Sequence, residues 1–246
     1  MFAAQFRDRI VHHWLIKKLN SFFENVFIED AYACRTGKGT HFGIRRMRDF
    51  IEQCALENEG EAYVLKLDIR GFFMHISRPL LFDKLEDFIA KNDKVEDKLF
   101  LLDMARRIIF NDPTKNCFIK GDKLLWDDLP KDKSLFHSPA ESGLPIGNLT
   151  SQVFANFYLN DFDHFVKEKL HIKYYGRYVD DFVLVHPDQK YLSGLISIIE
   201  NYLKTNLQLQ LHPKKRYLQH HTKWLYLRVT YYVNLMYMMV INYRVL

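Results

Sequence analysis

The stretch YYGRYVDDFVLVH, residues 174–186, decides the fold, because it places two adjacent acids between two runs of aromatic and β-branched residues. Such runs are typical of β-strands, so the stretch predicts two short strands joined by a hairpin turn. Asp180 and Asp181 then lie at the hairpin tip and project together at one edge of a sheet. Two like charges this close are costly unless a cation neutralises them, and carboxylate oxygens suit Mg²⁺. The alternative is that Asp-Asp is ordinary turn chemistry.

A third acid ends another predicted strand more than a hundred residues earlier. Residues 63–73 read YVLKLDIRGFF, an apolar strand that reaches Asp68 and is followed by a glycine and two bulky aromatics. A site for two divalent ions needs several carboxylates that converge on ions about 3.5–4 Å apart. Asp68, Asp180 and Asp181 supply that set of ligands.

These two motifs together resemble the palm of a reverse transcriptase, and the resemblance extends along most of the chain. The segment GLPIGNLTSQ, residues 143–152, is similar to the segment that precedes the palm helix in this family. The family commonly carries Gln-Gly-x-x-x-Ser-Pro there, whereas this chain has Ile146 in place of Gln and Gln152 in place of Pro. This version resembles that of the reverse transcriptases of diversity-generating retroelements, whose copying is selectively unfaithful at template adenines.

The early segment YACRTGKGTH, residues 32–41, agrees with that subgroup. Arg-x-Gly-Lys-Gly-x-His resembles its fingers motif, whereas group II intron enzymes usually carry a Gly-Phe-Arg-Pro-like run. Arg35 and Lys38 bracket a glycine that lets the backbone approach a triphosphate, and both can neutralise phosphate charge. The segment is not a Walker A loop, because the four-residue spacer and the Lys-Ser/Thr pair are absent.

The resemblance implies a role for each candidate residue. The catalytic acids are expected to be Asp68, Asp180 and Asp181. Two Mg²⁺ ions are expected at Asp68, Ile69, Asp180 and Asp181. The incoming dNTP is expected to contact Arg35, Lys38, Phe73, Ile146 and Gly147. Template and primer are expected to contact Gln152, Arg45, Arg46, Lys214 and Lys215.

The roles expected of Phe73 and Ile146 have a physical basis. The ring of Phe73, five residues after Asp68, is expected to exclude a 2′-hydroxyl by steric clash. Ile146 removes a polar contact that Gln would make, and a loosely fixed base pair is a route to misincorporation. For the basic clusters at 45–48 and 214–216, a solvated helix or strand face is the open alternative.

The expected fold class is α+β, a right-hand polymerase with fingers and palm, in which the palm is an antiparallel sheet packed on helices. Apolar spacing predicts helices over about 10–22, 43–56, from Arg78, over 94–109, and from Thr150 with an aromatic stripe at Phe154, Tyr158, Phe162 and Phe165. A strand is predicted at 207–211 and a hairpin at 118–125. The expected division is 1–62 fingers, 63–80 palm strand with the first catalytic Asp, 81–142 fingers and palm insertion, 143–222 palm, and 223–246 an aberrant or truncated C-terminus in place of the thumb.

Composition fits this interpretation. The chain has 246 residues, 48% of them hydrophobic, and a formal net charge of +5, which favours a polyanionic partner. Its three cysteines indicate neither a disulfide framework nor a zinc site. The expected partners are a template RNA, a DNA or RNA primer, dNTP and a small basic accessory protein, with no membrane. Charge appears before any apolar run at the N-terminus, so we expect a cytoplasmic protein without a signal peptide.

The resemblance ends near Gln219. Residues 224–246 contain no Gly and no acid, and they are a poor membrane span because Thr230, Asn234 and Asn242 interrupt them. An exposed strand of this composition would be prone to aggregation. The Trp codon TGG begins a glycine codon when read one base later, so a frameshift near Lys223 would explain both the lost motif and the missing thumb.

Three functions therefore stay open at this point. The first is an RNA-directed DNA polymerase of a diversity-generating retroelement. The second is a group II intron or retron-type reverse transcriptase, which Ile146 and Gln152 disfavour. The third is a non-catalytic, truncated RNA-binding remnant, which the unusual C-terminus favours and the three acids disfavour.

Overall fold

The computed structural model describes residues 2, 4–115, 117 and 130–226. The hairpin predicted at 118–125 and residues 227–246 of the predicted aberrant C-terminus lie outside them. The chain folds into two compact units, each described by itself. Unit 1 comprises Met1–Val26, Gly71–Tyr158 and Leu207–Leu209, and unit 2 comprises Phe27–Arg70, Leu159–Asn206 and Gln210–Leu246.

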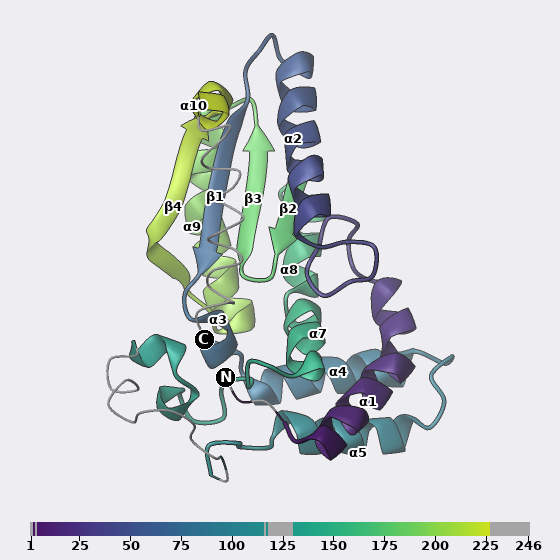
Figure 1. The fold of residues 1–246 in the computed structure, drawn as a ribbon. Helices are drawn as coiled ribbons and strands as arrows, with labels where there is room; N and C mark the ends of the chain where they lie inside the picture. Colours follow the sequence, from purple (N-terminus) through teal and green to yellow (C-terminus); the bar gives the residue numbers. More distant parts are fainter. Residues whose placement is uncertain (1, 3, 116, 118–129, 227–246) are drawn as a thin grey trace. The chain divides into compact units, whose positions relative to one another are not determined.

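Unit 2 is built on a four-stranded sheet whose strands are all antiparallel to their neighbours (Figure 1). The sheet order is β2-β3-β1-β4, with β1 at Tyr63–Ile69, β2 at Tyr174–Tyr178, β3 at Asp181–His186 and β4 at Leu211–His220. The helices are α2 (Thr40–Glu57), α8 (Asn160–His164), the π-helical turn η3 (Phe165–Lys169), α9 (Gln189–Leu207) and α10 (His221–Tyr226). The predicted α+β class, with an antiparallel sheet packed on helices, is confirmed.

Helices cover both faces of this sheet, and the alternation of strand side chains decides which residue meets which helix. On one face, Met47 and Phe50 of α2 belong to a buried cluster with Val64, Val183 and Val185. On the other face, rings from α8, η3 and α9 pack together and onto the sheet, with centroid distances of 5.1 Å for Phe162–Phe182 and 4.1 Å for Phe165–Tyr202. Because successive residues alternate, Lys66 and Asp68 share the face of Val64.

Unit 1 is helical within its described residues. It contains α1 (Phe6–Glu24), α3 (Phe72–His75), α4 (Arg78–Lys91), α5 (Lys98–Ile109) and α7 (Leu149–Tyr158), with short 3₁₀ turns η1 (Lys131–Lys133) and η2 (Leu135–His137). Phe23, Phe88 and Phe157 form an aromatic core with ring centroids 4.9–5.5 Å apart. Helix α4 starts where the sequence predicts it, because Ser77 accepts a hydrogen bond from the Leu80 amide and Pro79 occupies the first turn.

Two predicted elements differ from the structure. The strand predicted at 207–211 is wrong: α9 runs to Leu207, and β4 begins only at Leu211. Leu207, Leu209 and Leu211 are buried in alternation, but Gln208 has φ = 54°, which a strand cannot accommodate. The single helix predicted from Thr150 is also wrong, since α7 ends at Tyr158. A new helix, α8, starts at Asn160 with acids in its first turn, where the helix dipole favours them.

Candidate active site

The three predicted catalytic acids meet at one end of the sheet in unit 2. Asp68 at the end of β1 lies directly opposite Asp181 at the start of β3. Tyr178 pairs with Asp181, so Val179 and Asp180 form a two-residue turn between β2 and β3. The Asp180 carbonyl accepts a hydrogen bond from the Ile69 amide at 3.2 Å, which ties the turn to β1. The structure thus brings Asp68, Ile69, Asp180 and Asp181 together.

Two lysines supply positive charge to this carboxylate cluster. The Nζ atom of Lys215 on β4 lies 2.8 Å from Oδ2 of Asp68, and the Nζ atom of Lys66 on β1 lies 3.0 Å from Oδ1 of Asp181. The Lys66 side chain is only 10% exposed, and a lysine is rarely buried to this extent unless it is paired, as Lys66 is with Asp181. Among the described residues, no lysine or arginine forms an ion pair with Asp180. Like charges directly opposite each other destabilise a sheet, so the pairing of Asp68 with Asp181 lowers the stability of the fold.

The electrostatics single out Asp180. Burial, followed by the charges of Asp181 and Asp68, raises the pKa of Asp180 to about 8. Burial also raises the pKa of Asp181, although Lys66 opposes the shift. For Lys215, burial lowers the pKa, but the hydrogen bond to Asp68 and the surrounding acids outweigh it, and the pKa is raised overall.

This arrangement predicts a pH-dependent stability that a divalent cation removes. The folded chain holds a proton on Asp180 up to about pH 8, whereas the unfolded chain releases it near the ordinary Asp pKa of about 3.9. The contribution of Asp180 to the free energy of unfolding is therefore greatest below about pH 4 and declines up to about pH 8. We expect denaturation midpoints between pH 5 and pH 8, in steps of about one unit, to show this decline without Mg²⁺ and a flatter profile with it. An unchanged slope in Asp180→Asn would contradict the assignment.

The residues fit a hard divalent ion. No group of three His, Cys, Asp or Glu side chains in the described part of the chain is already gathered as a metal cage. The cations beside Asp68 and Asp181 are instead lysines. Carboxylate oxygens are the ligands that Mg²⁺ prefers, and a bound cation would favour the ionised form of Asp180, which pairs with no lysine or arginine among the described residues. The same three acids would therefore hold the ion, with Lys66 and Lys215 moving aside.

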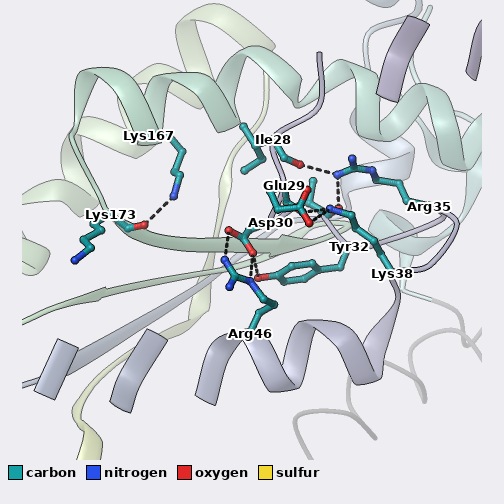
Figure 2. Close-up of polar contacts among 10 residues, drawn as sticks. Ile28, Glu29, Asp30, Tyr32, Arg35, Lys38, Arg46, Lys167 and Lys173 are labelled. Atoms are coloured by element: carbon teal, nitrogen blue, oxygen red, sulfur yellow. Dashed lines mark hydrogen bonds and ion pairs between the residues drawn. The ribbon is translucent and has the colours of Figure 1, made fainter. Parts of the chain in front are cut away.

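Arg35 and Lys38 belong to a loop in which both side chains form hydrogen bonds to neighbouring backbone carbonyls (Figure 2). Nη1 of Arg35 donates to the carbonyls of Ile28 at 2.6 Å and Ala31 at 2.8 Å. Nζ of Lys38 donates to the Glu29 carbonyl and lies 2.8 Å from its carboxylate. The loop needs glycine, because Gly37 and Gly39 have φ of 75° and 114°. Triphosphate binding by Arg35 and Lys38 stays a prediction.

The basic cluster on α2 divides into two kinds of residue. Arg46 makes a two-point ion pair with buried Asp30, at 2.7 Å and 3.1 Å, and Tyr32 donates to the same carboxylate (Figure 2). The Tyr32 ring lies against Gly176, where an added Cβ would be 2.4 Å from its hydroxyl. Arg45 on α2 is exposed, as is Lys214 on β4. Of the four basic residues predicted to contact template or primer, Arg46 and Lys215 thus have partners within the chain.

The other predicted site residues lie in unit 1. Phe73 on α3 is buried, and its carbonyl accepts from the Leu144 amide at 2.8 Å, which places α3 against the segment that leads to Ile146. The Ile146 carbonyl accepts from the Phe2 amide, and Gly147 has φ = 123°, which favours glycine. Gln152 lies in the first turn of α7. A shared pocket formed by these four residues and the carboxylates stays a prediction.

Three residues with clear partners were not assigned from the sequence: Lys66, Asp163 and Arg177. Lys66 and Arg177 are charges inside otherwise apolar strands, and that interruption is the signal that could have found them. Asp163 carries no such signal, because its buried position on α8 depends on tertiary packing.

An antiparallel sheet packed on helices, with Asp180 in a hairpin turn and Asp68 opposite Asp181 on the central strands, matches the arrangement predicted for a polymerase palm. Comparison with known proteins agrees. Residues 3–231 match the reverse transcriptase (RNA-dependent DNA polymerase) family. The chain therefore belongs to this family.

Individual relatives are distant and longer. Protein YkfC of Escherichia coli (strain K12) is 24% identical over 166 residues, covering 66% of this chain and 36% of YkfC. The structure of apo telomerase from Candida tropicalis gives a TM-score of 0.58 at 12% identity, covering 85% of this chain and 36% of that one. Telomerase from Candida albicans, solved with a fragment of telomeric RNA, gives 0.52 at 16% identity, covering 85% and 35%. The chain thus spans about a third of the length of these proteins, and the telomerase likeness shows the fold alone.

No helix among the described residues has both the length and the apolar character that a membrane span requires.

Proposed function

We propose that this chain is the catalytic part of an RNA-directed DNA polymerase that copies a template RNA into cDNA. The observation that carries the proposal is the meeting of Asp68, Asp180 and Asp181 at one end of the sheet in a member of the reverse transcriptase family. The acids lie on strand ends and in a turn that strands hold on both sides, which suits a site that must keep its ligands in place.

The proposed chemistry is nucleotidyl transfer at the carboxylate cluster. Two Mg²⁺ ions, when bound, would activate the primer 3′-hydroxyl and stabilise the charge on the leaving pyrophosphate. Asp68, Ile69, Asp180 and Asp181 are the residues that would hold them. The chain's own contribution is to fix Asp68 and Asp181 opposite each other and to offer Asp180, which forms no ion pair with a lysine of the described part of the chain. Lys66 and Lys215 keep the metal-free site from accumulating an uncompensated charge.

Within the family, we assign the chain to diversity-generating retroelements, with errors concentrated at template adenines. Ile146, Gln152 and the Arg35 to His41 segment support this assignment. An isoleucine at position 146 offers no side-chain hydrogen bond to the nascent base pair, and fixation of the pair is where fidelity arises. The assigned partners are a template RNA, a primer, dNTP and a small basic accessory protein, and the assigned location is the cytoplasm.

Primer extension on an adenine-containing RNA template, followed by sequencing of the cDNA, tests the subtype. We expect misincorporation opposite adenine to exceed that opposite the other three bases by about tenfold or more, and Ile146→Gln to reduce that excess. Glu168→Gln, a change at an exposed acid on η3, is the matched control and should leave the error spectrum unchanged. Extension with uniform fidelity would instead favour a group II intron or retron-type enzyme.

Phe73 is expected to select deoxynucleotides by excluding the ribose 2′-hydroxyl. Phe73→Val removes most of the ring and should raise the ratio of ribonucleotide to deoxynucleotide incorporation by about 10–200-fold, the range over which an apolar pocket discriminates a difference of one small group. The measurement is kcat/KM for both nucleotides on the same primer. Phe72→Val, at the neighbouring buried ring, is the control. An equal change in both variants would show that packing, not exclusion, is responsible.

A further inference from the structure

A buried charge cluster lies in unit 2 beside the turn that carries Asp180. The guanidinium of Arg177 on β2 is fully buried and pairs with the carboxylate of Asp163 on α8, through Nε at 2.8 Å and Nη2 at 2.6 Å. Both side chains have no solvent exposure. The Tyr175 hydroxyl donates to the same carboxylate at 2.6 Å. This geometry holds the guanidinium in one orientation.

The remaining terminal nitrogen of Arg177 reaches the turn itself. Its Nη1 donates to the carbonyl of Val179 at 2.9 Å. Val179 is the first residue of the two-residue turn, and the next residue is Asp180. Arg177 therefore connects a helix on one face of the sheet to the backbone immediately before the catalytic acids.

The turn needs such support because its backbone is strained. Val179 has φ = 57°, a left-handed conformation that is rare for a β-branched residue. Strained backbone persists only where surrounding contacts determine it, and it gathers at functional sites. The Val179 side chain is buried, so packing and the Arg177 hydrogen bond act on the same residue.

A purely structural role explains the cluster poorly. A buried ion pair is often no more stabilising than uncharged residues of similar size. Arg177 and Tyr175 lie on the α8 face of β2, whereas Asp181 follows the other alternation, the one shared with Val183 and Val185. The cluster thus lies on the opposite face of the sheet from the Asp181 side chain and contacts the turn through the Val179 carbonyl.

We propose that Arg177 is a positioning residue: it fixes the Val179 carbonyl and so holds the turn in the conformation that presents Asp180 and Asp181 to a divalent cation. Asp163 sets the orientation of Arg177 through its two-point contact. The inference rests on the proposed function, because it names the support of the same metal-binding acids.

The test is the double variant Arg177→Met with Asp163→Asn, which removes both charges together and keeps an acceptor for Tyr175. Mn²⁺ binding is followed by electron paramagnetic resonance of the free ion, and kcat and KM for dNTP by primer extension. We expect the Mn²⁺ half-saturation concentration to rise by about 10–100-fold, as for other partners that orient metal ligands. At saturating metal, kcat should fall while KM for dNTP stays within about twofold, since the dNTP contacts are untouched.

Two further variants separate positioning from stability. Adding Val179→Gly to the double variant should restore most of the Mn²⁺ affinity, because glycine adopts φ near 57° without strain. Tyr175→Phe removes one hydrogen bond to Asp163 and leaves the contact with Val179, so Mn²⁺ affinity should stay within about twofold of wild type. Where the double variant does not fold, Arg177→Lys provides the same readout, because lysine cannot span Asp163 and the Val179 carbonyl together.

The outcomes are distinct. Unchanged Mn²⁺ affinity and kcat in the double variant, with an active wild-type chain, would overturn the positioning role and leave the proposed function standing. An equal loss in Tyr175→Phe would also overturn it, since general destabilisation would then be the cause. A folded wild-type chain that neither binds Mn²⁺ nor extends a primer would overturn the proposed function, and this inference with it.

Discussion

Asp180→Asn is expected to abolish primer extension and, in the same molecule, to stabilise the metal-free fold. Activity should fall at least about 10³-fold, because a lost metal ligand that stabilises the transition state by about 4 kcal/mol corresponds to that factor. Stability should rise, since Asn removes the carboxyl group whose pKa burial and two neighbouring acids raise to about 8. At pH 8 without Mg²⁺, the thermal midpoint should increase by about 2–4 °C for each kcal/mol recovered.

Asp188→Asn is the matched control. Asp188 is an exposed acid that accepts the amides of Lys190 and Tyr191 at the start of α9, and Asn can perform the same capping. It should leave both activity and thermal midpoint unchanged. An Asp180→Asn chain that extends primers as wild type does, or that is less stable than wild type at pH 8, would contradict the proposed role of Asp180.

Asp163→Ala is expected to be the most destabilising single substitution considered for unit 2. It leaves the fully buried Arg177 charged and without its two-point partner, and breaking a buried pair in this way costs about 3–5 kcal/mol. The thermal midpoint should fall by on the order of 10 °C for a chain of this size. Thermal unfolding followed by circular dichroism measures the change.

Two comparisons interpret this loss. Glu57→Ala breaks an ion pair with Lys173 that has similar distances but lies at the surface, and it should change the midpoint little. Arg177→Met with Asp163→Asn should recover most of the stability lost in Asp163→Ala. A double variant as unstable as Asp163→Ala would show that the ion pair itself, rather than an unpaired charge, governs stability.

Local sequence pattern was sufficient to predict the hairpin with Asp180 in its turn. Asp181, which was also predicted at the tip, is instead the first residue of β3. Residues 174–186 hold two runs of aromatic and β-branched residues, which predict strands, and the turn falls at Val179 and Asp180. Asp68 could be placed at a strand end for the same reason. The direct pairing of Asp68 with Asp181 could not be predicted from composition and spacing alone, because register between distant strands depends on the whole sheet.

Sequence alone also does not tell whether a cation is already engaged. Arg46 looks like a nucleic-acid contact in the cluster at 45–48, yet buried Asp30 holds it in a two-point pair. Lys215 likewise lies on Asp68. In each case the partner is remote in sequence, and only the fold brings the opposite charges together. The strand predicted at 207–211 was wrong for a local reason, since the positive φ of Gln208 is invisible in an alternating pattern.

We propose that the acids at the β1 and β3 ends catalyse deoxynucleotide addition on an RNA template. The most direct test of this proposal is addition of a single deoxynucleotide to a primer annealed to RNA, measured across a Mg²⁺ titration with the intact chain and with Asp68→Asn. The account predicts a product extended by one nucleotide that requires Mg²⁺ and is lost in Asp68→Asn. No product from the folded intact chain at any Mg²⁺ concentration, or a product that persists in Asp68→Asn, would contradict it.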